Sequence, residues 1–329
     1  MKLFRLVSLA FFILIAAPPV FAQSAPNPTA QSVNEEQLFK QEKRIDGRIT
    51  IPDERARFLI QPQGRDWRQF HEVYLPWIAG SLIILMLIGL ILFYLIAGPV
   101  RATSRPTGQR LVRFPPIERF THWMVATSFI ILTLSGLNYI FGKRMLMPLI
   151  GAGAFGELSQ WAKYAHNFFA WPFVIGVAMM VIFWTRDNLF RASDWQWLRA
   201  RGSLIGGAHV SAGRFNAGQK MMFWSVALGG LLMFVSGLAL LFPFGLFDIA
   251  GMQWSQIVHG IIGAIFITGI LAHIYIGTIG MEGAFEAMGE GTVDVSWARQ
   301  HHDLWADEVS GSARSEPVSS PTSGARQHL

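Results

Sequence analysis

The sequence predicts an all-α protein, a polytopic bundle of helices that cross a membrane. Of its 329 residues, 52% are hydrophobic and only 15% are charged, whereas charged residues make up about 25% of ordinary soluble domains. Five long apolar stretches account for this composition, and each could cross about 30 Å of hydrocarbon as one helix. The chain has no cysteine, which excludes disulfides, thiolate-bound metals and cysteine-ligated iron–sulfur clusters.

The N-terminus has the pattern of an exported chain. Residues 1–22 form a secretory signal peptide in which Lys2 and Arg5 precede an apolar core and residues 20–22 (VFA) provide the cleavage site. An uncleaved first anchor is the alternative. Residues 23–73 are polar and contain too few apolar side chains to make a core. We expect a poorly ordered or partner-bound arm there, outside the cytoplasm.

The five expected spans follow in order. The first, residues 74–97, carries no histidine and is expected to be an additional anchor ahead of a four-helix core at residues 111–309. The core spans are expected at residues 123–142, 161–184, 221–247 and 252–281. Residues 143–160 are expected to be a short glycine-rich loop. Residues 310–329, rich in Ser, Pro and Gly, are expected to be a disordered tail.

Basic residues predict the orientation of the helices. The connections before residues 123–142 and before residues 221–247 are rich in arginine, whereas the connections after these two spans hold few basic residues or none. Arginine-rich loops stay in the cytoplasm. In a bacterial inner membrane, the N-terminus is then periplasmic and the C-terminus cytoplasmic, which agrees with the export signal.

Four histidines fall within or at the edges of these spans. His122 starts a span at the cytoplasmic side, and His166 lies near the outer start of the next. His259 and His273 are fourteen residues apart on the last span, so they lie on nearly one face and roughly 21 Å apart along the axis. Depth therefore sorts the four into an outer pair, His166 with His259, and an inner pair, His122 with His273.

Each pair joins two helices, as bis-histidine ligation of a haem iron requires. An ionisable side chain is costly in hydrocarbon unless it has a partner or a function. The sequence therefore predicts two b-type haems, whereas a zinc site would need three or four ligands at one place. Glycines near the pairs would make room for the macrocycle, although close helix packing is the better explanation for any single one of them: Gly136, Gly260, Gly263 and Gly277.

Other motifs are less informative. The remaining histidines lie outside the spans and are expected to be solvated: His71, His209, His301, His302 and His328. The segments LSGL (residues 134–137) and VSGL (residues 235–238) are too short to establish an internal repeat. The loop arginines that orient the helices explain the net charge of +6. No basic stripe with interleaved aromatics points to nucleic acid.

From about Leu111 to Glu308 the chain resembles the gamma subunit of respiratory formate dehydrogenase, a membrane cytochrome b. The matching segments are ERFTHW (residues 118–123), YAHNF (164–168), RFNAGQKMMFW (214–224), QIVHGIIG (256–263), LAHIYI (271–276) and WARQHHDLW (297–305). The FNAGQKMMFW run is the most specific of them. The resemblance implies a di-haem core in which the same four histidines ligate the irons, with the pairing that depth predicts.

The resemblance also implies a quinone site beside the inner haem, lined by Asn216, Gly218, Gln219 and His273. From the residues alone, the NAGQ segment is explained equally well as the first turn of a helix with Asn216 as its cap, and both explanations could hold.

The resemblance further implies two periplasmic partners, a catalytic subunit with molybdenum or tungsten and an iron–sulfur subunit. Electrons would enter at the outer haem, pass to the inner haem and reduce quinone near the cytoplasm. The chain would hold no formate site. Residues 1–97 precede the part that resembles the family, and their role does not transfer; we hypothesise that the arm contacts a periplasmic partner.

Two other functions remain open from the sequence. The chain could be the cytochrome b of a membrane hydrogenase or of a sulfur-compound reductase, although the RFNAGQKMMFW segment favours formate dehydrogenase. A histidine-relay transporter is an alternative of a different class. It would show no Soret absorbance, and it predicts broken helices or paired repeats, which the sequence does not display.

Overall fold

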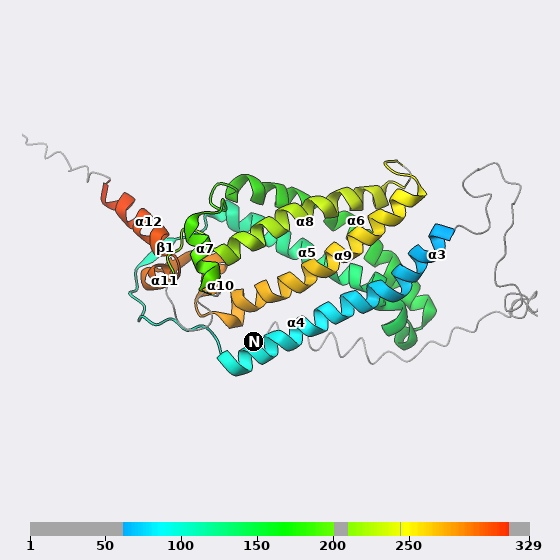
Figure 1. The fold of residues 1–329 in the computed structure, drawn as a ribbon, viewed down its shortest axis with the longest axis horizontal. Helices are drawn as coiled ribbons and strands as arrows, with labels where there is room; N and C mark the ends of the chain where they lie inside the picture. Colours follow the sequence, from blue (N-terminus) through cyan, green and yellow to red (C-terminus); the bar gives the residue numbers. More distant parts are fainter. Residues whose placement is uncertain (1–61, 201–209, 244, 316–329) are drawn as a thin grey trace, which may run out of the picture. The chain divides into compact units, whose positions relative to one another are not determined.

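A computed structural model describes residues 62–200, 210–243 and 245–315 of the chain (Figure 1). Within these ranges, five helical segments are long and apolar enough to cross a membrane: Asp66–Ala97, Pro116–Met145, Met147–Trp184, Ala217–Leu241 and Ile249–Gly280. The predicted class, an all-α multi-pass membrane protein with one helix ahead of four others, is confirmed. The expected signal peptide and most of the expected polar arm lie outside the described residues.

The first membrane helix begins earlier than expected. It is built from α3 (Pro62–Gln69), a π-helical turn η1 (Phe70–Tyr74) and α4 (Leu75–Ala97), whereas the apolar stretch starts only at residue 74. The polar residues before that point continue the helix. Within this added part of the helix, Trp67 stacks on His71 one turn later, with ring centroids 5.6 Å apart.

The second and third membrane helices follow one another almost directly. Helix α5 (Pro116–Met145) has Glu118 in its first turn and basic residues in its last, which complements the helix dipole. Helix α6 (Met147–Trp184) includes most of the expected loop, so that expectation is wrong. Alanine, leucine and glutamate between the glycines favour helix there. Only Gly151 departs from it, with φ 82° and ψ 161°, a conformation available essentially to glycine alone.

The remaining helices are shifted from their expected limits by several residues. A short helix α7 (Ala192–Arg199) precedes α8 (Ala217–Leu241). Helix α8 ends six residues before the predicted 247, because Pro243 cannot continue a helix. Helix α9 (Ile249–Tyr275) ends in a π-helical turn η3 (Ile276–Gly280).

The helices contribute to two compact units. Within the ranges that the structure describes, the first unit contains residues 62–84, Ala126–Val174 and Leu231–Ile267; the second contains Leu85–Val125, residues 175–200 and 210–230, and residues 268–315. In the first unit, the ring of Phe129 lies 6.3 Å from that of Phe173 and 6.4 Å from that of Phe266. Leu75 packs on Gly260, where an added Cβ would lie 2.8 Å from the leucine Cδ2. Close packing therefore explains Gly260.

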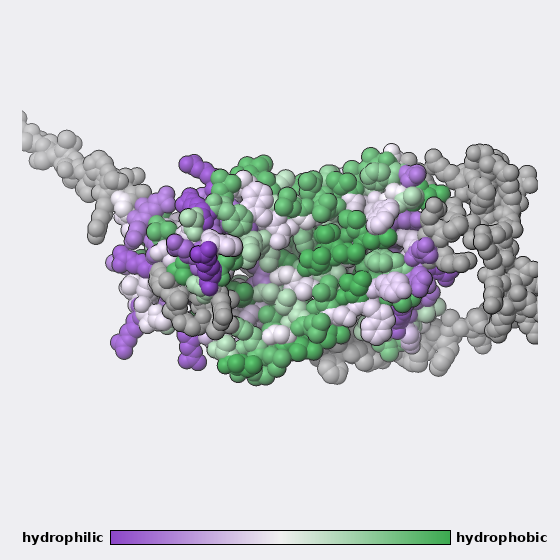
Figure 2. Space-filling model, in the orientation of Figure 1, coloured by the Kyte–Doolittle hydropathy of each residue, from purple (hydrophilic) through white to green (hydrophobic). Residues whose placement is uncertain are grey.

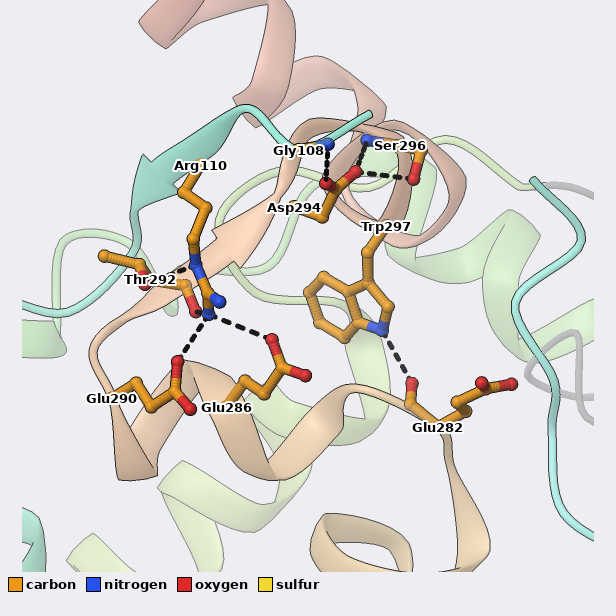
Figure 3. Close-up of polar contacts among 9 residues, drawn as sticks. All are labelled: Gly108, Arg110, Glu282, Glu286, Glu290, Thr292, Asp294, Ser296 and Trp297. Carbon is orange, nitrogen blue, oxygen red and sulfur yellow. Dashed lines mark hydrogen bonds and ion pairs between the residues drawn. The ribbon is translucent and has the colours of Figure 1, made fainter. Parts of the chain in front are cut away.

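In the second unit, segments before α5 and after α9 join in a polar cap. Strand β1 (Arg110–Val112) pairs antiparallel with β2 (Thr292–Asp294). The helices α10 (Ala284–Gly289) and α11 (Val295–His301) contact these strands, and α12 (Asp303–Ser315) packs on α11. Arg110 forms ion pairs with Glu286 and Glu290 at 2.9 and 2.7 Å, and Asp294 accepts hydrogen bonds from the backbone N–H groups of Gly108 and Ser296 (Figure 3). The surface of the cap is largely hydrophilic, whereas the surface of the membrane helices is mostly hydrophobic (Figure 2). Helix α12 continues into the first residues of the expected disordered tail.

The cap buries a histidine that was expected to be solvated. His302 is only 1% exposed, so the expectation is wrong for this residue. Its Nε2 accepts a hydrogen bond from Arg113 at 3.0 Å, and its Nδ1–H donates to the carbonyl of Gly213 at 2.8 Å. Arg113 is buried too, and its guanidinium lies over the ring of Trp305, 4.9 Å from the centroid. Burial and the neighbouring Arg214 lower the pKa of Arg113 to about 9, so it stays charged at neutral pH.

Acidification is expected to destabilise this cap. Burial, followed by the charge of Arg113, lowers the pKa of His302 well below its usual value. The unfolded chain therefore binds a proton below about pH 6.5 that the folded cap does not, and stability falls by up to about 1.4 kcal/mol per pH unit on acidification. Thermal unfolding of the purified protein at pH 7.5 and 5.5 measures this loss. The variant His302→Gln should lose less stability between the two pH values; an equal loss would assign the effect to other groups.

Candidate haem and quinone sites

The outer histidine pair lies within the first unit. His166 on α6 and His259 on α9 face each other with ring centroids 6.2 Å apart and ring planes inclined by 57°. Two imidazoles that hold one iron from opposite sides, each through a bond of about 2 Å, place their centroids roughly 6 Å apart. The pair therefore has the spacing for bis-histidine ligation.

Two serines orient the outer histidines. Ser135 Oγ on α5 lies 2.8 Å from Nδ1 of His166, and Ser236 Oγ on α8 lies 3.1 Å from Nδ1 of His259. Each serine hydroxyl donates to a carbonyl one turn earlier in its own helix, at 2.7 Å in both cases. Its oxygen is then left to accept the Nδ1–H of the histidine. This arrangement holds the tautomer whose Nε2 lone pair is available to a metal.

A glycine follows each of these serines and gives the histidine room. A Cβ on Gly136 would lie 3.8 Å from Cε1 of His166, and a Cβ on Gly237 would lie 3.2 Å from Cε1 of His259. The segments LSGL and VSGL therefore perform the same task for the two outer histidines. Sequence reasoning noticed the similarity but missed both serines and Gly237, because four residues are too few to establish a repeat.

The inner pair lies within the second unit. His122 on α5 and His273 on α9 have ring centroids 6.1 Å apart and planes inclined by 51°. Nδ1 of His122 is buried and has no hydrogen-bond partner in the described part of the chain. The spacing matches that of the outer pair, but His122 lacks the serine that supports each outer histidine. At Gly277, one turn after His273, an added Cβ would meet no atom within 4 Å.

Three of the four residues expected to line a quinone site, Asn216, Gly218 and Gln219, form the start of α8, whereas His273 lies on α9. The backbone N–H of Gln219 donates to Asn216 Oδ1, and the backbone N–H of Asn216 donates to Gln219 Oε1, both at 3.0 Å. This reciprocal pair is a capping box, so the helix-start explanation is confirmed. Gly218 accommodates Trp197, whose ring would lie 2.9 Å from an added Cβ. The side-chain NH₂ groups of Asn216 and Gln219 take part in none of the hydrogen bonds of the described residues.

Charged residues near this helix start form a network that sequence reasoning missed. Arg214 pairs with Glu118 at 2.6 Å and with Asp187 at 2.8 Å, and Glu118 also accepts from the Trp184 indole at 2.7 Å. Beside it, Lys220 and Asp194 form a buried ion pair at 2.7 Å. A cavity of about 310 Å³ borders this network; its lining includes Asp187, Arg214 and Lys220 together with Arg186 and Arg191. Glu118 and Arg214 belong to the segments ERFTHW and RFNAGQKMMFW, which shows that part of these motifs is structural.

Two pairs of facing imidazoles carried by apolar helices are typical of a membrane cytochrome b. The chain belongs to the prokaryotic cytochrome b561 family, which it matches over residues 113–291. It is 30% identical over 204 residues to the cytochrome b556(Fdn) subunit of the nitrate-inducible formate dehydrogenase of Escherichia coli (strain K12), across 60% of this chain and 91% of that protein.

Two further relatives agree with this assignment. The cytochrome b556(fdo) subunit of formate dehydrogenase from the same strain is 30% identical over 203 residues, which cover 60% of this chain and 93% of that protein. The cytochrome b556 subunit of formate dehydrogenase from Haemophilus influenzae is 27% identical over 221 residues, 65% of this chain and 90% of that protein. The resemblance seen in the sequence is thereby confirmed. The chain is a multi-pass membrane cytochrome b with a role in electron transfer, and its family implies haem b as cofactor.

Proposed function

We propose that this chain is the electron-transfer subunit of a formate dehydrogenase complex and carries two b haems between a periplasmic iron–sulfur subunit and quinone. The observation that carries the proposal is the presence of two histidine pairs with nearly equal ring separations, 6.2 and 6.1 Å. Haem supplies reversible one-electron chemistry when bound. The chain supplies the ligands, the tautomer control through Ser135 and Ser236, and the apolar surroundings.

The direction of transfer in this proposal follows from the positive-inside rule. The arginine-rich connections before α5 and α8 lie in the cytoplasm, with the C-terminus. The pair His166–His259 is then periplasmic, next to the iron–sulfur subunit and a catalytic molybdenum or tungsten subunit. The pair His122–His273 is cytoplasmic. Formate oxidation outside, with proton uptake by quinone from inside, would build a membrane potential.

Quinone binds in this proposal beside the inner pair, near Asn216, Gly218, Gln219 and His273. The capping box occupies the side-chain oxygens of Asn216 and Gln219 but leaves their NH₂ groups available. An amide N–H can donate to a quinone carbonyl, so the same two residues can cap the helix and bind quinone.

Replacement of Asn216 by Asp separates these two roles. Asp caps a helix as well as Asn does, so stability should be kept, while loss of the NH₂ donor is expected to lower quinone reduction by about tenfold. The rate with quinone is compared with the rate with a dye that takes electrons from the soluble subunits. Asn216→Ala is the control that should lower the melting temperature as well. An unchanged quinone rate in the Asp variant would confine Asn216 to capping.

A pyridine haemochrome assay on the purified complex tests the proposal as a whole. Two b haems per chain and co-purification of a molybdenum or tungsten formate dehydrogenase are the expected results. Co-purification of a hydrogenase or of a sulfur-compound reductase would keep the fold and the cofactor but change the electron donor. A colourless protein would contradict the proposal and favour the histidine-relay transporter.

A further inference from the structure

The helix that precedes the cytochrome core contributes two aromatic side chains to a cluster with Tyr139 of α5 and Gln256 of α9. Trp67 on α3 stacks on His71, with ring planes inclined by 25°. His71 in turn contacts the ring of Tyr139 on α5 edge-on, at 5.4 Å between centroids. The Tyr139 hydroxyl accepts a hydrogen bond from Nε2 of Gln256 on α9 at 2.9 Å. All four residues lie in the first unit.

Two nitrogen atoms of this cluster have no partner. Trp67 Nε1 and His71 Nε2 are both buried, and neither makes a hydrogen bond in the described part of the chain. The indole N–H can only donate, and a neutral imidazole donates through one of its nitrogens. Buried donors are almost always satisfied in native proteins. The indole of Trp67 therefore points to a missing acceptor, and the stacked His71 can share that acceptor in the tautomer that carries its proton on Nε2.

Two members of the cluster, Tyr139 and Gln256, lie one helical turn from residues of the outer site. Tyr139 follows Gly136, which borders His166, by three residues, and Gln256 precedes His259 by three residues. From Gly136 to Tyr139 the chain runs toward the end of α5 at Met145, and from His259 to Gln256 it runs toward the start of α9 at Ile249. Haem carries two propionate carboxylates, and carboxylates avoid hydrocarbon. The propionates of a haem held by His166 and His259 would therefore extend along this short route to the membrane surface.

We propose that Trp67 Nε1–H and His71 Nε2–H bind a propionate of the outer haem. The inference rests on the proposed ligation of that haem by His166 and His259. The proposed site consists of two N–H donors that share one carboxylate. The negative charge of the carboxylate strengthens each of these hydrogen bonds.

The first helix is well anchored for this role. Leu75 packs against Gly260, one residue after His259, and Arg144 donates to the backbone carbonyl of Glu72. The helix that the sequence suggests to be a simple anchor thus becomes part of a haem site.

Redox titration of the whole complex, followed at the haem absorbance bands, tests the inference. The variants Trp67→Phe and His71→Phe keep the aromatic rings but remove the donors. Without these donors the negative charge of the propionate is less neutralised, which stabilises the ferric haem. Each variant should therefore lower the equilibrium constant for reduction of the outer haem about threefold, which lowers its reduction potential by about 30 mV. The potential of the inner haem should not change and serves as an internal reference.

Two control variants sharpen this test. Trp77 is 74% exposed on the same helix, so Trp77→Phe should leave both potentials unchanged. His71→Gln keeps an N–H donor and should restore most of the shift seen with His71→Phe. The variant His71→Phe could also lose the outer haem while it keeps the inner one. If His71→Gln then retains the outer haem, the loss supports the inference. If His71→Gln loses the outer haem as well, the loss contradicts the inference.

The outcomes also separate this inference from the proposed function. Absence of haem from the wild-type complex would overturn the proposed function itself. Two haems with an unchanged outer potential in both Phe variants would overturn only the propionate site. If the Phe variants release the soluble subunits while the outer potential stays constant, the donors bind a partner subunit and the inference is also wrong.

Discussion

Replacing His259 by Ala is expected to remove the outer haem and leave the inner one, which halves the haem content per chain. His166 would then lack its opposite ligand at 6.2 Å, and a single imidazole does not hold the iron in a bis-histidine site. His166→Ala should give the same result, because both residues serve one iron. The haem-to-protein ratio and the reduced-minus-oxidised spectrum of the purified complex measure the loss.

A serine variant provides the matched control for this prediction. Ser236→Ala removes only the hydrogen-bond acceptor of His259. Loss of such a supporting group typically costs about 10- to 100-fold in metal affinity, so the outer haem should be retained but released more easily. Two haems in both His166→Ala and His259→Ala would show that the pairing is wrong.

Replacing His122 by Ala is expected to remove the inner haem and with it all formate-driven quinone reduction. The outer haem should remain, because its ligands lie in the other compact unit. Formate oxidation with a dye that accepts electrons from the soluble subunits should be unaffected. A quinone rate close to that of the wild type would contradict the proposed route through the inner pair.

The comparison with His273→Ala tests the placement of quinone. His273 is proposed both to ligate the inner haem and to line the quinone site, whereas His122 is proposed only as a ligand. Both variants should lose the inner haem. Only His273→Ala should also weaken binding of a quinone analogue to the complex, as measured by direct titration.

Much of the architecture could be predicted because the membrane restricts the possible structures. In hydrocarbon, backbone groups must be satisfied within each segment, so a long apolar stretch is a helix. The rise of about 1.5 Å per residue converts sequence position into depth. Depth alone brought His166 together with His259 and His122 together with His273, as the structure places them.

The polar parts of the chain could not be predicted in the same way. The burial of His302 depends on the cap that forms when α11 and α12 fold onto the segment around Arg113. Nothing in the local sequence distinguishes this histidine from its neighbour His301. The helical start of α6 was missed because glycines suggest a loop, although only Gly151 departs from helical geometry.

The sequence by itself determined the class of protein, the five membrane helices and the two depths at which histidines meet, because hydropathy and helical rise are properties of single segments. The tertiary structure alone decided which side chains of other helices gather near the paired histidines. Ser135 and Ser236 reach His166 and His259 from neighbouring helices, and Trp67 and His71 come from the added first helix. Such contacts depend on how helices rotate and pack against each other, and no one segment contains that information.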